Sequence, residues 1–246
     1  MNKKNFQSLV IIIFLNSLSI NYFAQCLNGG CGAQMVSNPD FEILTATTNT
    51  NVPGSQVIDI TVTPVQSWYG TDPSGGSTPD YTNYYGATPT GAGVYNTACM
   101  TGNGEAGVFT KTPGANSREY IQAQLTSPLI ANQQYCFSMV VKGRQGAAGN
   151  LLSQCDGMGV WFHNLGMINI QTMNAGNQFL GPGSTINGSP QIQNPSGNMI
   201  GVACQTITGT FCAVGGENYI VIGNFRTDAA TTITGGTSNY MYIDNV

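Results

Sequence analysis

Aromatic side chains near one long loop are the residues of this sequence best suited to binding chemistry. The loop is a Gly-, Pro-, Ser- and Thr-rich stretch at 70–93, and a further aromatic residue lies on a separate strand near 161. Flat rings offer apolar faces to a ligand, and loops on a rigid scaffold display binding groups. We predict ligand contacts from six residues: Trp68, Tyr81, Tyr84, Tyr85, Trp161 and Arg144.

The same residue types are also ordinary parts of a β-sandwich, so a second interpretation stays open. Tyr and Trp favour strands and pack well in cores and at sheet edges. For Trp68 and Trp161 we favour a core position over ligand contact. For the adjacent pair Tyr84 and Tyr85, neither interpretation is preferred.

A catalytic site finds little support in the sequence. His163 is the only histidine, so any Ser-His-Asp or Cys-His site must use it, and no nucleophile elbow surrounds a serine. A glycosidase needs two carboxylates roughly 5 to 9.5 Å apart, and the sequence alone does not place such a pair. We therefore expect that the chain is not an enzyme.

The composition limits both the fold and the partners. Of 246 residues only 7% are charged, 32 are Gly, and the formal net charge is -4. Nucleic-acid binding needs clustered cations, which 7 Lys and Arg do not supply, so no nucleic-acid partner is expected. Abundant Gly, Thr, Asn and Ser disfavours helices and favours strands joined by tight turns.

Two strand-like stretches form the centre of the predicted fold. In the first, Ile121, Ala123 and Leu125 alternate with polar residues, which predicts one buried and one exposed face. The second, at 134–142, is apolar or small on both faces, as in a strand covered on both sides. The loop at 130–133 reverses the chain between them, and later strands are expected to extend the same sheet.

Further strand-like stretches follow the same pattern, with loops predicted at 70–93 and 181–197. We predict about nine strands and an all-β fold, an antiparallel β-sandwich of the jelly-roll type. The main strands are expected near 118–126, 134–142, 157–163, 205–214, 217–225 and 239–246, with others at 57–62 and 105–111.

The N-terminus has the pattern of a secretory signal peptide at 1–24. Lys3 and Lys4 precede an apolar run at 9–15, which is too short for a transmembrane helix. Cys26 raises the alternative of a lipoprotein, but Gln25 does not fit a lipobox, so simple cleavage is favoured. The mature domain at 25–246 is therefore expected to be secreted or on the cell surface, without a transmembrane segment.

Export places the seven cysteines in an oxidising compartment, where disulfides are expected. Cys26 and Cys31 bracket a turn-like Leu-Asn-Gly-Gly loop and are candidates for a local bridge. An odd number of cysteines leaves at least one thiol unpaired or intermolecular. No Cys-x-x-Cys pair supports a metal site of the Cys/His type.

Several motifs resemble an N-terminal module of surface proteins from gliding bacteria that use type IX secretion. The motifs include Asn-x-x-Phe-Glu, Arg-Glu-Tyr-Ile-Gln-x-Gln-Leu, Gly-Gly-Glu-x-Tyr-Ile-x-Ile-Gly-Asn-Phe and Tyr-Ile-Asp-Asn-Val, and the resemblance runs from about Met35 to Val246. That module resembles galactose-binding-like jelly rolls, the fold of many carbohydrate-binding modules. The resemblance implies a non-catalytic carbohydrate-binding module with a glycan or surface polysaccharide as partner, linked to C-terminal domains beyond Val246. The alternative is a structural or adhesive interaction domain without a small ligand.

The same resemblance implies a structural calcium ion between the first and last strands. Calcium prefers several hard oxygen ligands. Glu42 and Asp244 occupy the matching motifs and are the expected ligands, with Asp40 and Glu105 as weaker candidates. The alternative is that these carboxylates are solvated or accept N–H groups of loops.

Arg118 and Glu119 are adjacent at the start of a strand, so their side chains point to opposite faces and are not expected to pair. One of them is expected to anchor a loop, with the loop that carries Asp80 as the candidate. Charge reversal of Arg118 is expected to lower stability.

Overall fold

The structure is a computed structural model, and it describes most of the chain after residue 30. The described residues are 31–44, 58–59, 65–71, 79–83, 100, 102, 104–113, 117–144, 153–168, 172–173, 178–181, 184–187 and 189–246. The predicted signal peptide at 1–24, Cys26 and the pair Tyr84 and Tyr85 lie outside the described residues.

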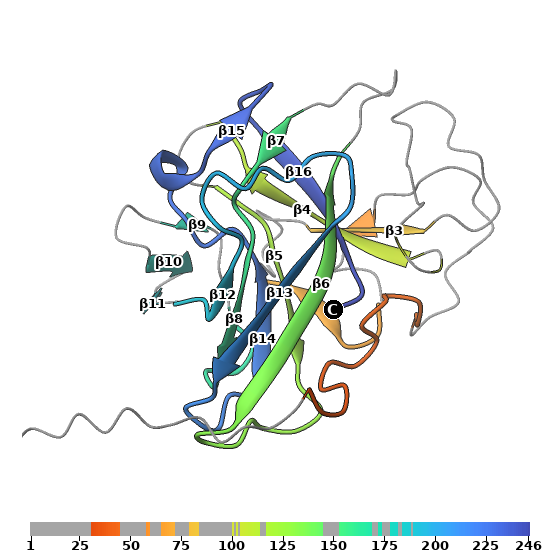
Figure 1. Ribbon diagram of the computed structural model, residues 1–246, viewed down its shortest axis with the longest axis vertical. Helices are drawn as coiled ribbons and strands as arrows, with labels where there is room; N and C mark the ends of the chain where they lie inside the picture. The colour runs from red at the N-terminus through yellow and green to blue at the C-terminus, as the bar shows by residue number, and fades with distance from the viewer. Residues whose placement is uncertain are drawn as a thin grey trace, which may run out of the picture.

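Two antiparallel sheets face each other and make up the domain (Figure 1). The six-stranded sheet has the order β1 (Ile58–Asp59), β3 (Asp80–Asn83), β4 (Gly104–Lys111), β16 (Asn239–Asp244), β6 (Gln134–Gly143) and β13 (Gln205–Cys212). The five-stranded sheet has the order β12 (Ile192–Gln193), β8 (Gly159–His163), β14 (Tyr219–Gly223), β5 (Tyr120–Gln124) and β2 (Trp68–Gly70). The all-β sandwich predicted from the sequence is confirmed.

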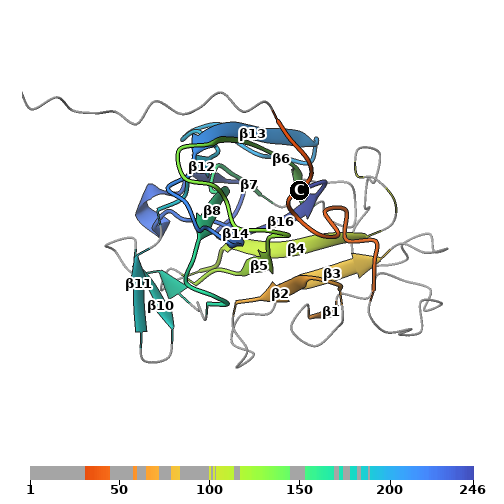
Figure 2. The same ribbon diagram turned by 90° about the horizontal axis from the view of Figure 1, so that it is seen from below.

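Smaller elements lie beside the sandwich. Strands β9 (Thr172–Met173), β10 (Gln178–Gly181) and β11 (Ser184–Asn187) form a three-stranded sheet next to β8 and β12 (Figures 1 and 2). Strands β7 (Gln154–Cys155) and β15 (Ile233–Thr234) pair with each other. The described part of the chain contains one short 3-10 helix at Asp228–Ala230 and no α-helix.

The core lies between the two large sheets, and the alternation seen in the sequence produces it. Ile121 and Ala123 of β5 face Met139 of β6 across the interior, and all three are completely buried. Each strand therefore contributes every second side chain, because successive residues of a strand point to opposite faces. Removing these apolar faces from water is the main favourable contribution to folding.

One expectation about the topology is wrong. Strands β5 and β6 do not pair: β5 lies in the five-stranded sheet between β14 and β2, and β6 lies in the other sheet between β16 and β13. The loop at 130–133 carries the chain from one sheet to the other. Alternation shows which face of a strand is buried, but it does not distinguish a neighbour in the same sheet from a strand across the core.

Both stretches predicted as loops contain strands. Strand β3 lies within 70–93, and its Tyr81 is buried in the core. Strands β11 and β12 lie within 181–197. These strands have two to four residues, so too few positions are present for a period-two pattern to appear in the sequence.

The segment 31–44 runs beside the C-terminal end of the chain, as the orange ribbon shows in both views (Figures 1 and 2). The Val246 N–H donates to the Pro39 carbonyl at 2.9 Å, and Val36 forms an isolated bridge with Leu125. No helix among the described residues has the length and hydropathy needed to cross a bilayer.

Candidate functional site

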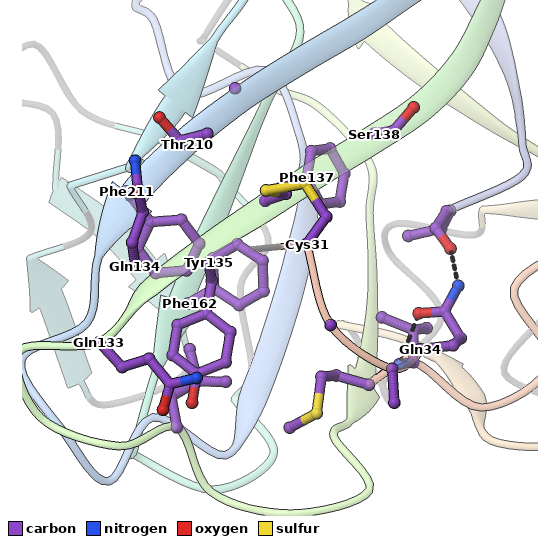
Figure 3. Close-up of a pocket in the computed structure, with 18 of the residues that line it drawn as sticks. Cys31, Gln34, Gln133, Gln134, Tyr135, Phe137, Ser138, Phe162, Thr210 and Phe211 are labelled. Carbon is purple, nitrogen blue, oxygen red and sulfur yellow. Dashed lines mark hydrogen bonds between the residues drawn. A yellow bond between two sulfur atoms is a disulfide. The ribbon is translucent and has the colours of Figure 1, made fainter. Parts of the chain in front are cut away.

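A cavity of about 900 Å³ opens at one end of the sandwich, between the first half of β6, the end of β13 and β8 (Figure 3). Its lining comes from residues 31–36, 127–130, 133–138 and 208–211, with Phe162, Asn245 and Val246. Cavities that bind small ligands in proteins have about this size, roughly 300–1,000 Å³.

Aromatic rings line the inner side of this cavity (Figure 3). Phe211 stacks on Phe162 with ring centroids 4.6 Å apart and an angle of 21° between the planes. Tyr135 pairs with Phe211 in the register of β6 and β13, and the centroids of these two rings lie 6.1 Å apart. The ring of Phe137 packs edge to face against that of Phe162. Tyr135 and Phe211 are only partly buried, so flat apolar surface remains accessible inside the cavity.

The N-terminal segment forms one wall and is attached at several points. A disulfide joins Cys31 to Cys136 of β6. The Gln34 side-chain amide donates to the Val246 carbonyl at 2.9 Å, and the Met35 carbonyl accepts the Thr126 N–H at 2.8 Å. The wall therefore has a fixed position relative to both sheets.

The polar groups of the cavity are all uncharged. Among the described residues that line it, none is Asp, Glu, Lys, Arg or His. Gln34, Gln133 and Tyr135 contribute amides and a hydroxyl to it. The lining residues Gln134, Ser138, Thr208 and Thr210 alternate with the rings along β6 and β13, so they point to the opposite face of that sheet. The Tyr135 hydroxyl oxygen accepts the Ile130 N–H at 3.0 Å, which leaves its own proton free to donate to a ligand.

The disulfide corrects the pairing expected from the sequence. Cys31 bonds to Cys136, 105 residues away, and not to Cys26. Cys204 and Cys212 are also disulfide-bonded. Cys155 is a buried free thiol, which confirms that at least one cysteine is unpaired.

Two of the predicted ligand-binding residues are buried in the core and make no surface for a ligand. Trp68 is 1% exposed, its ring lies 4.9 Å from that of Phe41, and its Nε1–H donates to the Asn38 carbonyl. Tyr81 is also 1% exposed. The core interpretation therefore describes both residues, because short strands at β2 and β3 turn these rings inward.

Of the other predicted residues, Trp161 and Arg144 are described by the structure, and neither lines the cavity. Trp161 lies on the outer face of the five-stranded sheet, where it stacks on His163 at 4.4 Å, and His163 in turn stacks on Tyr219. Burial lowers the pKa of His163 to about 4, so its imidazole is neutral at physiological pH. Arg144 lies on the six-stranded sheet with its guanidinium over the Tyr240 ring.

A second depression, of about 490 Å³, lies on the outer face of the five-stranded sheet at its β2 edge. Its lining includes the ring of Tyr69, which is 50% exposed, and the side chain of Met167, which is 46% exposed. Ser67 and Gln124 add a hydroxyl and an amide. This surface combines the same kinds of groups as the cavity.

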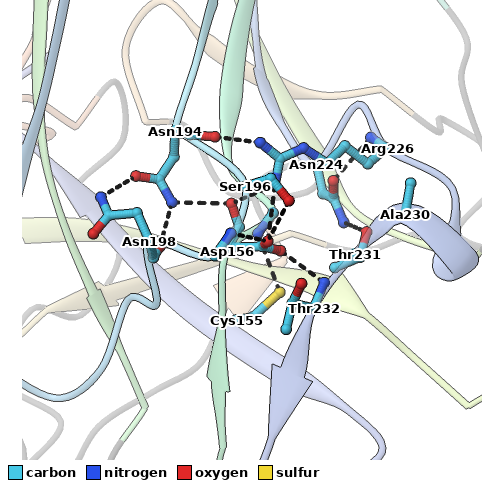
Figure 4. A network of polar contacts seen from close by, with 12 residues as sticks. Cys155, Asp156, Asn194, Ser196, Asn198, Asn224, Arg226, Ala230, Thr231 and Thr232 are labelled. Carbon is cyan, nitrogen blue, oxygen red and sulfur yellow. Dashed lines mark hydrogen bonds and ion pairs between the residues drawn. The ribbon is translucent and has the colours of Figure 1, made fainter.

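A polar network surrounds Asp156 (Figure 4), and none of the residues labelled there lines the cavity. The buried carboxylate accepts the N–H groups of Gly197 and Thr232, each at 2.8 Å, and Arg226 lies 3.2 Å away. These contacts join three separate loops to the strand β7. Both oxygens of this carboxylate therefore have partners within the protein.

Arg118 and Glu119 contact different partners, and the anchored segment differs from the prediction. Arg118 is completely buried and pairs with Asp228 of the 3-10 helix at 2.8 Å. Glu119 accepts the Phe109 N–H at 2.8 Å. The carboxylate of Asp80 instead accepts the Tyr240 hydroxyl, because both side chains lie on the outer face of the six-stranded sheet.

The residues of the cavity were not among those predicted from the sequence. Tyr135, Phe137 and Phe211 were assigned to strands, but nothing in one strand shows that its rings lie at the open end of a sandwich. The available signal was the spacing of the rings at every second position in 135–137. That spacing identifies a common face, and the register with β13 is what gathers the rings.

No protein-family model and no curated protein matches this sequence. Solved structures do. A cyclase from Fischerella sp. TAU, in complex with 4-(1H-indol-3-yl)butan-2-one, is 12% identical, with 87% of this chain and 95% of that chain covered and a TM-score of 0.46. The adhesin domain of Lys-gingipain from Porphyromonas gingivalis is 14% identical, with 77% and 94% covered and a TM-score of 0.37.

A third similar structure is the C-terminal family 22 carbohydrate-binding module of Clostridium thermocellum Xyn10B. It is 14% identical, with 79% of this chain and 92% of that chain covered and a TM-score of 0.35. At these identities the likeness concerns the β-sandwich fold alone.

The expectation that the chain is not an enzyme is contradicted by these comparisons. Cyclases from Fischerella, which are enzymes, are among the similar structures.

Proposed function

We propose that this chain is a carbohydrate-binding domain and that its cavity holds a neutral sugar. The observation that carries the proposal is the combination of accessible rings, at Tyr135 and Phe211, with amide and hydroxyl groups and no lining charge. Sugars have apolar C–H faces that pack on flat rings and hydroxyls that pair with amides and hydroxyls. An anionic glycan would lose its hydration in this cavity without gaining a cation.

Export to an oxidising compartment fits the same proposal. A disulfide between Cys31 and Cys136 persists in secreted and surface proteins and is rare in the cytosol. Together with the predicted signal peptide, this supports a secreted or cell-surface protein. We further propose, from the sequence resemblance, that type IX secretion delivers it and that additional domains follow it.

The test is the affinity of the Phe211→Leu variant for neutral glycans. Leucine keeps an apolar group against Phe162 but removes the flat ring, so we expect an affinity loss of about tenfold, equivalent to about 1.4 kcal/mol. Titration calorimetry against soluble xylan, β-glucan and mannan, with polygalacturonate as the charged comparison, measures it.

Val214→Ala is the control, because Val214 lies just after β13, the strand that contains Phe211, but is 83% exposed and does not line the cavity. It should bind as the wild type does. Absence of binding to every glycan would favour the alternative, a structural or adhesive domain without a small ligand.

We also propose a structural calcium ion, as the resemblance implies, held by Glu42 and Asp244. Both lie beside the start of β4: Glu42 accepts the Gly104 N–H, and Asp244 follows Ile243, which pairs with Ala106. The two carboxylates therefore belong to segments beside the same end of β4, whereas Glu105, the weaker candidate, forms an ion pair with Lys142. No group of three or more His, Cys, Asp or Glu that fits a metal is found among the described residues, so backbone carbonyls would complete the set.

Calcium is expected to raise the melting temperature of the wild type and to have no such effect on Glu42→Ala, because a ligand that binds only the folded state stabilises it. Thermal melts with excess calcium and with chelator measure this. Equal transitions in both buffers would exclude the ion.

A further inference from the structure

The cavity and the outer depression are separated by a single stretch of chain. Met35 and Val36 line the cavity, whereas the next residue, Ser37, lines the depression. On the paired segment, Leu125 lines the depression and Ser127 lines the cavity. Val36 and Leu125 form an antiparallel bridge, so residues of the same two paired segments line both sites.

The groups in the depression are held in place by the sheet. Tyr69 pairs with Gln122 in the register of β2 and β5. The Gln122 side chain is buried and donates to the carbonyls of Gly70 and Ile168, while its oxygen accepts the Ile168 N–H. This amide joins the strand that carries Tyr69 to the loop that carries Met167. The half-exposed ring and thioether are therefore fixed beside each other.

The chemistry of the depression matches that of the cavity. An exposed ring and an apolar thioether are accompanied by the amide of Gln124 and the hydroxyls of Ser37 and Ser67. None of the described residues lining the depression is charged. A ligand that suits one site therefore suits the other.

We infer that the two sites are successive subsites for one neutral oligosaccharide chain, which passes from one site to the other beside the bridged pair Val36 and Leu125. This inference rests on the proposed carbohydrate-binding function and specifies its ligand as a chain and not a single sugar. A monosaccharide fills one site, whereas an oligosaccharide contacts both. Affinity therefore increases with chain length, and Tyr69 contributes only to the binding of long chains.

The experiment compares wild type, Tyr69→Ala and Leu165→Ala by calorimetry with monosaccharides and hexasaccharides of the xylose, glucose and mannose series. Leu165 is the matched control, because it is 56% exposed near the same loop and lines neither site. For Tyr69→Ala we expect a loss of about tenfold in hexasaccharide affinity and no change in monosaccharide affinity. Leu165→Ala should match the wild type with both.

Two contrary results have different meanings. Equal affinity for short and long sugars, with no effect of Tyr69→Ala, would overturn the inference and leave the cavity as the binding site. Absence of binding to every sugar by the wild type would overturn the proposed function and this inference with it.

Discussion

Replacement of Asp156 by alanine is expected to lower the free energy of unfolding by about 3–5 kcal/mol. The change removes the acceptor of the Gly197 and Thr232 N–H groups and the charge partner of the largely buried Arg226 guanidinium. A buried charge that loses its partner carries a large desolvation cost. Urea unfolding at pH 7 measures the loss. Asp40→Ala, at a partly exposed carboxylate, is the control and should change stability by less than about 0.5 kcal/mol.

Because of the same contacts, the contribution of the Asp156 carboxylate to stability depends on pH. Burial favours a higher pKa for Asp156, but the N–H groups of Gly197 and Thr232 and the nearby Arg226 outweigh it and lower the pKa below its usual value. A carboxyl with a lowered folded-state pKa stabilises the fold above its unfolded pKa of about 4 and loses this contribution as pH falls through the folded value. The stability difference between wild type and Asp156→Asn should therefore shrink below about pH 4. A difference that stays constant from pH 7 to pH 3 would contradict this account.

Removal of the Cys31–Cys136 disulfide is expected to have a comparable effect. The bond closes a loop with a sequence separation of 105 residues, and the loop-entropy relation gives about 4–5 kcal/mol for such a length. The double variant Cys31→Ser, Cys136→Ser should therefore melt at a clearly lower temperature. Because Cys31 also holds the cavity wall, glycan affinity should fall at temperatures where the variant is still folded.

Ser127→Ala is the control for this pair of effects, because Ser127 lines the same cavity and takes no part in the disulfide. It should retain the wild-type melting temperature. Unchanged stability and affinity in the double variant would show that hydrogen bonds alone hold the N-terminal segment.

Much of the fold follows from local patterns in the sequence. The six main strands lie where alternation and turn residues predict them, for example β5 within 118–126 and β13 within 205–214. In a strand with one apolar face, the alternation in the sequence predicts which side chains are buried, because every second residue faces the core. Glu105–Lys111 likewise lies in β4.

The arrangement of these strands could not be predicted in the same way. The assignment of β5 and β6 to different sheets depends on which strands share hydrogen bonds, and alternation carries no such information. The Cys31–Cys136 bridge depends on the same long-range arrangement, so the short spacing of Cys26 and Cys31 led to the wrong pair.

The candidate site was harder still to predict. Trp68 and Tyr81 were candidate ligand contacts because they lie near a Gly-rich loop, but both rings are buried in the core, the position already favoured for Trp68. The accessible rings belong instead to Tyr135 and Phe211, within strands that look in sequence like ordinary core strands. An aromatic residue in a strand is accessible or buried according to what covers it, and that is decided by distant segments such as 31–36.

Amide chemical-shift mapping by NMR tests the central proposal most directly, because it locates a ligand as well as detecting it. Addition of a neutral oligosaccharide is expected to shift the amide signals at 133–138 and 208–211, which line the cavity. Signals around Asp156 and the 3-10 helix at Asp228–Ala230 should stay in place. Shifts confined to residues outside the cavity, or no shifts at saturating sugar, would contradict the assignment of this cavity as a carbohydrate site.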